Sequence, residues 1–396
     1  MHRFVLSTVG TSLLSNQLRQ KDPKNWQVMI DKTANWTEDK IQKYEPDVID
    51  IILELKNRAE EKLYDGNILN IREASAELNG IYGLYQEQIN QGKQDIHFLL
   101  ASDTYQNKIT SEILQSFLIN QGINISINKP AGFTTGSNEA FTQGIDELLN
   151  WFEETIPGYK DSGYEICFNL VGGFKAIQGF VNTFGMFYAD KIIYIFEGVN
   201  SELITIPRLP VKINTEVIKP VEFALMAAEN SVAINVNQLA KVPESLIFVY
   251  DDEAILSNWG RLTWNNCKYD LFKKDLLLFP CLVYEKSFEK DYLRHTVDDK
   301  IKYELHSALA EISATMLKFN GDTSRINKRF RYKRYEGSQK CEGGLKKNEI
   351  DHFYLNKNEG WRVSCVIEEI KDSQKKTKKV LRMRHFGEHD YVNDNP

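Results

Sequence analysis

The sequence has few cysteines that could cross-link the chain and no long apolar run that could anchor it in a membrane. It contains five cysteines among 396 residues, and no two of them are spaced as a Cys-x-x-Cys pair. An odd number without that spacing indicates neither a disulfide framework nor a zinc site, which favours a reducing compartment. No apolar run approaches the ~20 residues that a membrane-spanning helix needs, and the opening MHRFVLSTVG lacks the features of a signal peptide. We therefore expect a cytoplasmic protein without a membrane partner.

Positive charge is scarce overall but unevenly placed. The whole chain has 49 Lys and Arg against 55 Asp and Glu, whereas residues 282–396 have 24 against 19. The densest basic stretch, 325–347, interleaves nine Lys and Arg with Phe330, Tyr332 and Tyr335. Cations beside stacking rings suit a nucleic-acid partner, and a solvated basic loop is the alternative. The candidate contacts to RNA or a ribosome are Arg329, Arg331, Lys333, Arg334 and Lys340.

Residues 1–212 alternate apolar strands with helices. Runs at 3–10, 96–103 and 164–173 read as buried strands, and 36–64 and 67–92 carry helical periodicity. This pattern predicts an α/β domain with a doubly wound, mainly parallel sheet. The three strands end in STVGTS, LASDT and NLVGGFK, and such strand ends hold ligands in open α/β sheets. None of the loops is a G-x-G-x-x-G or Walker A sequence, so a dinucleotide or ATP is not indicated.

The rest of the chain changes character after Pro210. Residues 213–278 mix short strands and helices and read as a compact connector, and 279–396 read as a separate α+β domain. We expect its order to be a strand, two helices and an antiparallel meander that ends in a strand over 379–392. Because side chains alternate along a strand, Arg382 and Arg384 should share one face, and Met383 and His385 the other.

Four motifs of the first domain resemble the CARF family, the Rossmann-like sensors of type III CRISPR systems. They are STVGTSLL (7–14), EASAELNGI (73–81), LLASDT (99–104) and NLVGGFKA (169–176). The resemblance implies a homodimer that binds cyclic tetra-adenylate or cyclic hexa-adenylate as activator, with no resident cofactor. Backbone amides and a lysine suit such a cyclic polyphosphodiester. The residues carried over are Thr8, Gly10, Thr11, Ser12, Ser102, Asp103, Asn169, Gly172, Gly173 and Lys175.

Residues 280–396 resemble RelE/ParE-type toxins through VYEKSFEKDYLRH (283–295), GWRVSCVIEE (360–369) and VLRMRHFGEHDYV (380–392). This resemblance implies cleavage of mRNA in the ribosomal A site without a metal, by attack of the ribose 2′-OH. Arg362 and Tyr391 match residues of the family site, and His385 or Arg384 matches its basic position before the final Tyr. His352 and Tyr354 stand near the register of two family lysines. The whole chain is similar to CARF–winged-helix–RelE fusions, the CRISPR-associated mRNA interferases, with 213–278 as the winged-helix-like part.

Metal-free cleavage needs a base, an acid and a group that stabilises the phosphate. We expect Arg362 to stabilise the phosphate, His385 to transfer a proton, and Tyr391 to orient or stack a base. Further candidates are Arg384, His352 and His389, and the general base stays unassigned.

Two other functions stay open at this stage. Arg384 and His389 fit the R-x4-H form of HEPN ribonucleases, and Arg382 and His389 fit the R-x6-H form. A HEPN-type enzyme would cut free RNA. The other alternative is a ligand-responsive DNA-binding regulator that acts through the winged helix, against which the acidic first 281 residues argue.

Overall fold

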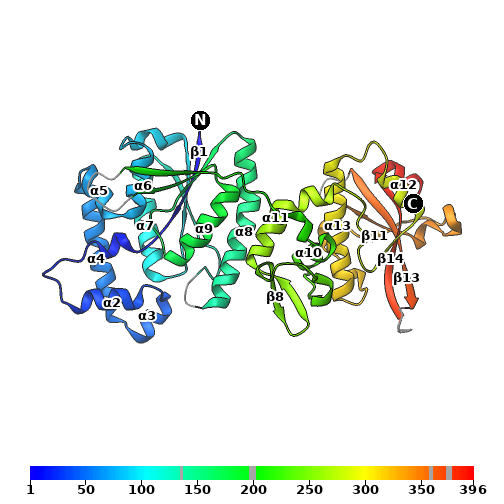
Figure 1. Ribbon diagram of the computed structural model, residues 1–396, viewed down its shortest axis with the longest axis horizontal. Helices are drawn as coiled ribbons and strands as arrows, with labels where there is room; N and C mark the ends of the chain where they lie inside the picture. The colour runs from blue at the N-terminus through cyan, green and yellow to red at the C-terminus, as the bar shows by residue number, and fades with distance from the viewer. Residues whose placement is uncertain (134–136, 196–201, 356–359, 372–376) are drawn as a thin grey trace. The chain divides into compact units, whose positions relative to one another are not determined.

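The computed structural model describes residues 1–133, 137–195, 202–355, 360–371 and 377–396. The chain forms two compact units, Met1–Lys212 (unit 1) and Ile213–Pro396 (unit 2), whose elements are drawn in Figure 1. The first boundary coincides with the expected one after residue 212.

Unit 1 is built on a six-stranded sheet in the order β3-β2-β1-β4-β5-β6. The first five strands are parallel and β6 runs antiparallel to β5, so the expected doubly wound, Rossmann-like sheet is confirmed. Since β1 and β4 are neighbours, the strand order reverses between them, which is where such folds bind ligands. The strands are β1 (Arg3–Thr8), β2 (Ile96–Leu100), β3 (Asn124–Asn128), β4 (Glu165–Asn169), β5 (Lys191–Ile195) and β6 (Leu203–Pro207).

Helices cover both faces of this sheet, as adjacent residues of β1 illustrate. Phe4 lies 6.1 Å from Trp151 of α8 between ring centroids, whereas Val5 clusters with Leu84 of α6. The helices are α1 (Ser12–Ser15), α2 (Asn25–Thr33), α3 (Glu38–Tyr44), α4 (Asp47–Asp65), α5 (Ile68–Ala74), α6 (Ala76–Leu84), α7 (Tyr105–Asn120), α8 (Asn138–Asp161) and α9 (Lys175–Tyr188). Within the described ranges of the chain, no helix is long and apolar enough to cross a membrane.

The long helical stretches expected at 36–64 and 67–92 are each broken. Pro46 separates α3 from α4, because proline lacks the N–H that a helix interior needs. Ser75 ends α5 in an extended conformation (φ −147°), and its side chain accepts a hydrogen bond from the N–H of Leu78. This cap starts α6 and places Glu77 in its first turn.

The first part of unit 2 has a three-stranded antiparallel sheet in the order β7-β9-β8. Its elements are α10 (Pro220–Ala227), β7 (Ile234–Asn235), β8 (Ile247–Tyr250), β9 (Glu253–Leu256) and α11 (Asn258–Phe272). Residues 213–278 are all described, and between β7 and β8 they form only short 3₁₀ turns. DNA-binding proteins of the helix-turn-helix type read the major groove with a helix. The helices of this part, α10 and α11, lie before β7 and after β9, and the winged-helix-like arrangement stays a prediction.

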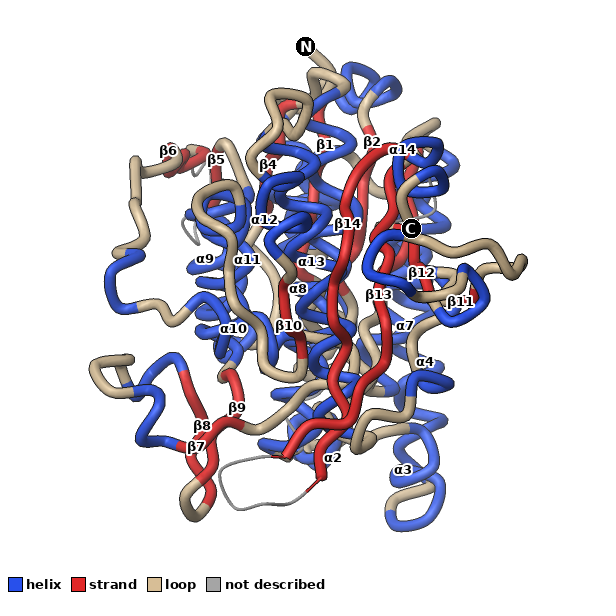
Figure 2. Tube along the Cα trace, turned by 90° about the vertical axis from the view of Figure 1, so that its right-hand side faces the viewer, coloured by secondary structure: helices blue, strands red, loops and turns tan. Residues whose placement is uncertain are grey.

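The second part of unit 2 has a five-stranded sheet in the order β10-β14-β13-β12-β11. Figure 2 shows β13 and β14 running side by side as long strands. The expected order of a strand, two helices and a meander is confirmed. The elements are β10 (Leu282–Tyr284), α12 (Lys286–Tyr292), α13 (Asp299–Lys318), β11 (Lys333–Arg334), β12 (Asp351–Tyr354), β13 (Trp361–Lys371), β14 (Thr377–Glu388) and α14 (His389–Asp394).

Two details of this part differ from the expectation. The basic stretch contributes a short edge strand, β11, which pairs with β12. The last strand ends at Glu388, so His389 and Tyr391 lie on the helix α14 and not on a strand. Strand alternation therefore says nothing about where these two side chains point.

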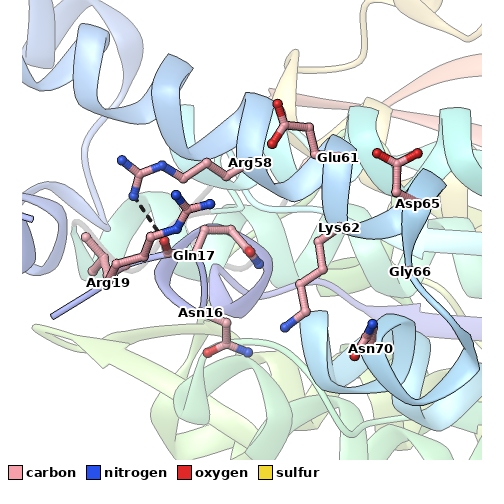
Figure 3. Close-up of a pocket in the computed structure, with 10 residues that line it drawn as sticks. Asn16, Gln17, Arg19, Arg58, Glu61, Lys62, Asp65, Gly66 and Asn70 are labelled. Carbon is pink, nitrogen blue, oxygen red and sulfur yellow. Dashed lines mark hydrogen bonds between the residues drawn. The ribbon is translucent and has the colours of Figure 1, made fainter. Parts of the chain in front are cut away.

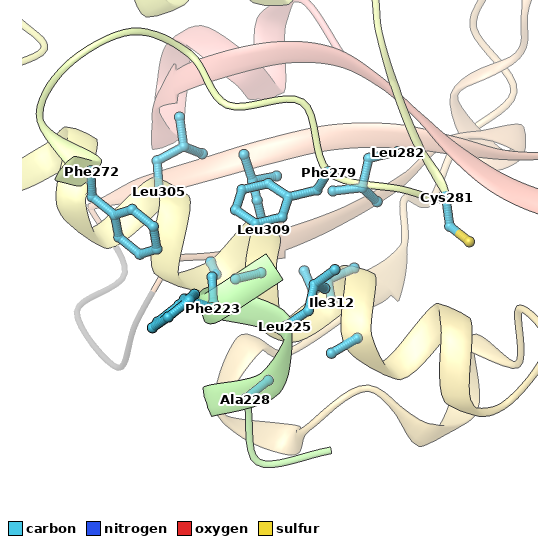
Figure 4. Close-up of a cluster of buried hydrophobic side chains, with 14 of the residues drawn as sticks. Phe223, Leu225, Ala228, Phe272, Phe279, Cys281, Leu282, Leu305, Leu309 and Ile312 are labelled. Carbon is cyan, nitrogen blue, oxygen red and sulfur yellow. The ribbon is translucent and has the colours of Figure 1, made fainter. Parts of the chain in front are cut away.

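One hydrophobic core runs through the whole of unit 2. Leu305, Leu309 and Ile312 of α13 belong to the same buried cluster as Phe223 of α10 and Met383 of β14, and Figure 4 shows several of these side chains gathered around α13. The boundary expected between residues 278 and 279 falls inside this single compact unit.

Because the core is shared, a cavity in the connector should loosen the distant sheet. We expect Phe223→Ala to lower the free energy of unfolding of unit 2 by about 3–5 kcal/mol. Hydrogen exchange of the full chain should show faster exchange in β13 and β14 together with α10. The control is Val249→Ala, because Val249 is 55% exposed. Unchanged protection of β13 and β14 in Phe223→Ala would mean that the two parts are independent domains.

Candidate functional site

The loops that follow β1 and β4 in unit 1 touch through their backbones. The hydroxyl of Thr8 donates to the carbonyl oxygen of Gly172 at 2.5 Å. A Cβ atom on Gly10 would lie 2.9 Å from the nitrogen of Gly173, and Gly173 itself has φ +107°. Glycine is required here because a side chain would separate the loops or strain the backbone.

The loop after β2 is tied to the same place by Asn107 of α7. Its Nδ2 donates to the carbonyl oxygen of Val9 at 2.7 Å, and its Oδ1 accepts from the N–H of Ser102 at 3.0 Å. Asn169 completes the network, because its Nδ2 donates to Ser7 Oγ and to the carbonyl oxygen of Glu77, both at 3.1 Å. The structure therefore brings the three loops predicted from the sequence together.

Burial divides the ten expected ligand residues into two groups. Thr8, Ser102 and Asn169 are at most 1% exposed and hydrogen-bond within the loops, so they hold backbone in place. Asp103 forms an ion pair with Lys129 at 2.6 Å, and its carboxylate would repel a phosphate. Lys175 is exposed and begins α9, where free N–H groups and the helix dipole favour an anion.

Of the remaining five members, Gly10 and Gly172 are buried. Thr11, Ser12 and Gly173 are half-buried at the start of α1 and in the β4 loop. With Lys175 and the half-buried Asp103 they are the members whose atoms a ligand can reach.

Glu77 is a functional candidate that the sequence reasoning missed. Its side chain is fully buried, Oε1 accepts from the N–H of Gly10 at 2.7 Å, and Oε2 accepts from Ser75 Oγ at 2.5 Å. A Cβ on Gly172 would lie 2.0 Å from Oε1. The carboxylate of Glu77 thus contacts both the Gly10 loop and the Gly172 loop. The sequence signal that could have indicated Glu77 is the helix cap at Ser75, two residues before it.

Unit 1 also contains a hollow whose lining differs in charge from the three loops. It has a volume of about 460 Å³ and is lined from the chain after α1 and from α4 to α5 (Figure 3). None of the expected ligand residues lines it. Arg58 donates to Asp22 at 2.6 Å and to Glu54 at 2.8 Å, and Glu61 and Asp65 share the lining. Its cations are therefore balanced by acids, which does not suit a polyphosphate.

In unit 2 the polar residues of β12, β13 and β14 share one face of the sheet. His352 lies opposite Ser364, which in turn lies opposite His385. Val363 and Cys365 belong to the hydrophobic core, so Arg362 and Ser364 occupy the other face, as alternation predicts. Arg362 is only 2% exposed.

A bulge in β14 brings Arg384 and His385 to this same face. The pairing with β13 shifts between Ser364 and Cys365, which leaves Arg384 without an opposite residue. Arg384 Nη2 donates to the carbonyl oxygen of Glu342 at 2.5 Å, and His385 Nε2 lies 3.9 Å from Glu342 Oε2. The expectation that Met383 and His385 share a face is wrong.

Asp291 of α12 is the second residue that the sequence reasoning missed. Its side chain is 3% exposed and accepts from His385 Nδ1, from the N–H of Phe386 and from the hydroxyl of Tyr391, each at 3.0 Å. Arg294 lies 2.7 Å from its Oδ1. Because a carboxylate only accepts, it selects the tautomer in which Nδ1 carries the proton and Nε2 can accept one. The motif 283–295 contains Asp291, but only the packing of α12 on β14 reveals this contact.

The two buried arginines differ in how many of their donors are engaged. Arg362 donates through its Nη atoms to Asn393 and to Tyr354. Arg384 Nε and Nη1 are buried and make no hydrogen bond among the described residues. Arg362 leaves its buried Nε without a partner among the described residues, so Arg384 has two unsatisfied nitrogen atoms against one in Arg362, reversing their expected order.

Two histidines are less suited to proton transfer than expected. His352 stacks on Tyr335 at 4.1 Å between ring centroids, and burial, followed by the charge of Arg362, lowers its pKa to about 4. Such an imidazole is a weak base. His389 lies on α14, and its Nδ1 is 2.8 Å from Asp390 Oδ1. It does not join the His385 cluster directly.

The HEPN geometry also differs from what the chain contains. Arg382 forms an ion pair with Glu368, and Arg384 lies on a strand while His389 lies on the following helix. HEPN sites are built on helices of an all-helical domain. The R-x4-H and R-x6-H spacings therefore do not create that site here.

The aromatic rings of the basic stretch point inward, so their expected role as stacking surfaces is wrong. Phe330 is in the hydrophobic core, the hydroxyl of Tyr332 donates to Asp351 at 2.9 Å, and Tyr335 lies against His352.

The cations of the stretch differ in exposure and in their ion pairs. Lys333 and Lys340 are exposed, and Arg331 is exposed with its guanidinium 5.9 Å from the Tyr354 ring. Arg329 pairs with Glu311 at 3.2 Å, and Arg334 pairs with Asp351 at 2.9 Å. The exposed lysines are the members best placed for RNA.

A hairpin made by residues 337–348, here called the cover hairpin, lies over the polar face. The N–H of Asn348 donates to the carbonyl oxygen of Gly337 at 2.9 Å, and the tip at Glu342 contacts Arg384 and His385. Lys347 Nζ donates to the carbonyl oxygen of Asn393 in α14 at 2.8 Å. This hairpin and α14 explain why the arginines beneath them are buried.

The contact between Gly172 and Glu77 can be tested by a matched pair of glycines. We expect Gly172→Ala to lower the free energy of unfolding of unit 1 by about 1–3 kcal/mol, because the new Cβ overlaps the buried carboxylate. Gly179 of α9 has no atom within 4 Å of its Cβ position, so Gly179→Ala should be neutral or stabilising. Urea denaturation measures both. Equal stabilities would show that the Glu77 cradle is not tight.

The lowered pKa of His352 predicts acid lability of unit 2. Between pH 6.5 and about 4, His352 is protonated in the unfolded chain but stays neutral in the folded chain. The free energy of unfolding therefore falls as the pH falls through this window. We expect His352→Gln to recover on the order of 2 kcal/mol of that loss. His306, whose pKa burial also lowers to about 4, should leave a residual slope. Urea unfolding across the window measures this, and a slope equal to that of the wild type would contradict it.

The comparison with known families concerns unit 1. Residues 72–209 match the family model described as CRISPR-associated protein (Cas_APE2256), which is of the CARF type. The match begins inside α5, covers Glu77 and the loops after β2 and β4, and ends just after β6. The loop after β1, which includes Thr8 and Gly10, lies before it. Residues 72–209 are therefore similar to a CRISPR-associated family of the CARF type, which supports the expected resemblance over this part of unit 1.

Proposed function

We propose that this chain is an mRNA endoribonuclease of type III CRISPR antiviral defence, activated by cyclic oligoadenylate and dependent on the ribosome. The observation that carries the nuclease assignment is the Asp291–His385 pair beside Arg384. A buried imidazole held in one tautomer, next to a guanidinium with open donors, is suited to transfer a proton at a phosphodiester.

The residues can divide the reaction as follows. His385 Nε2 takes the proton of the ribose 2′-OH, whose oxygen forms a bond to the adjacent phosphorus. Arg384 donates to the phosphate oxygens as negative charge develops on them. The bond from phosphorus to the 5′-oxygen breaks, and a proton returned by the imidazolium completes the leaving alcohol. The products are a 2′,3′-cyclic phosphate and a free 5′-hydroxyl.

Asp291 and Tyr391 act as positioning residues in this scheme. Asp291 fixes the imidazole and stabilises its charged form, as the carboxylate of a catalytic triad does. Tyr391 donates its hydroxyl to Asp291, and the guanidinium of Arg294 lies 3.8 Å from the centre of its ring. It therefore orients Asp291 more directly than it orients a base.

The activator is proposed to bind the three loops of unit 1 in a homodimer, in contact with Lys175 and the first turn of α9. The CARF-type match supports this class of ligand, and the exposed N-terminus of α9 suits its phosphates. The exposed Lys333 and Lys340 are proposed contacts to RNA or the ribosome. The reaction as written uses no metal ion.

The activity is tested with purified ribosomes, mRNA and the full chain, with and without cyclic tetra-adenylate or cyclic hexa-adenylate. We expect cleavage only with an activator and ribosomes, and a loss of about 10²–10⁴-fold in the cleavage rate for His385→Ala and for Asp291→Asn. His389→Ala is the matched control and should retain activity, because His389 lies outside the Asp291 cluster.

Three outcomes would contradict this proposal. Wild-type activity of His385→Ala would remove the assigned site. Cleavage of free RNA at the same rate would favour a HEPN-type activity over a ribosome-dependent one. Absence of any cleavage, with duplex DNA binding instead, would favour the regulator.

A further inference from the structure

A separate hollow lies beside the Asp291–His385 pair in unit 2. It has a volume of about 280 Å³. Its walls come from the turn between α12 and α13, the start of β13 and the β14–α14 junction, and they include Arg294, His295, Thr296, Trp361, Glu388 and Tyr391. Small-molecule pockets usually hold about 300–1,000 Å³, so this hollow suits one compact ring system and not a large ligand.

The walls combine aromatic surface with charged groups of both signs, Arg294 and Glu388. Trp361 is half-buried and rests against Phe386, with 5.2 Å between ring centroids. Tyr391 packs so closely on Gly387 that a Cβ there would lie 2.6 Å from its ring. Both aromatic walls are thus supported from behind by β14, which keeps them in place without a ligand.

This hollow shares its wall with the proposed catalytic pair. Arg294 and Tyr391 line it, and both also contact Asp291, at 2.7 Å and 3.0 Å. Asp291 in turn holds His385. Two side chains therefore connect the hollow to the imidazole, and the ring of Tyr391 in its wall lies 6.0 Å from the His385 ring between centroids.

We propose that the hollow binds one nucleobase of the RNA next to the cleaved bond, with Trp361 as its stacking wall. Every base has a π-face, and base–aromatic stacking is the common means of holding single-stranded RNA. Arg294 adds positive charge and N–H donors for the attached phosphate, and His295 adds a ring N–H. The inference rests on the proposed function, and it gives the stacking role that the sequence suggested for Tyr391 to Trp361.

Photo-crosslinking of the full chain tests this independently of cleavage. The probe is a 2′-O-methyl RNA that contains 5-iodouracil, which binds but cannot be cut, in the presence of ribosomes and activator. Adducts are located by peptide mass spectrometry. We expect an adduct at Trp361 or Tyr391 in the wild type and in Trp361→Phe, and a loss of about tenfold in Trp361→Leu, which keeps apolar bulk but no π-face.

A second variant covers the case in which Trp361→Leu folds poorly. Thr296 is exposed on the turn that lines the hollow, so Thr296→Trp should fill the hollow without disturbing the sheet and should also abolish the adduct. An adduct elsewhere, or equal yields in all variants, would overturn the inference. A wild type that crosslinks at Trp361 but never cuts mRNA would overturn the proposed function and leave the base pocket standing.

Discussion

The carboxylate of Asp291 is the contact on which the polar side of unit 2 depends. It accepts from an imidazole, a backbone N–H and a phenol and pairs with a guanidinium, which come from β14, α14 and the turn after α12. Burying a charge costs several kcal/mol unless donors surround it, and here they do. One side chain thereby ties β14 and α14 to the turn after α12 and sets which nitrogen of His385 carries the proton.

The cover hairpin gives this arrangement a second property. Its tip offers a backbone carbonyl to Arg384 and the Glu342 carboxylate to His385, so oxygen atoms occupy the region where a phosphate would lie. In the proposed reaction, RNA must replace these contacts to reach the imidazole. The two open donors of Arg384 mean that the hairpin satisfies this arginine only in part, and a phosphate offers more acceptors than the hairpin does.

The sequence predicts those parts that follow from regular periodicity. Alternation along 361–366 places the side chain of Arg362 on the face of β13 that points away from the core residues Val363 and Cys365, as observed. It fails within β14, because the bulge at Arg384 inserts one residue and turns His385 to the other face. Nothing in the letters around Arg384 indicates a bulge, since it arises from pairing with a strand 20 residues away.

Glu77 and Asp291 were not predicted from the sequence for a different reason. Glu77 and Asp291 are acidic side chains on short helices, a type of residue that is usually solvated. Their role comes from tertiary packing, which buries each against the end of a strand that is distant in sequence. Helical periodicity cannot reveal such a partner.

The carboxylates of Glu77 and Asp291 make the same kind of contact in the two units, since each accepts a hydrogen bond from a backbone N–H near the end of a strand. Glu77 accepts the N–H of Gly10 after β1, and Asp291 accepts the N–H of Phe386 near the end of β14. In each case a backbone donor that the sheet does not use is satisfied by a charged acceptor, and a chemically active segment is held in one conformation. An unpaired buried N–H costs about 1–3 kcal/mol, so neither acid can be replaced by an apolar residue without releasing the segment it holds. The same hydrogen bond therefore sets both the stability of each segment and the geometry of the candidate site beside it.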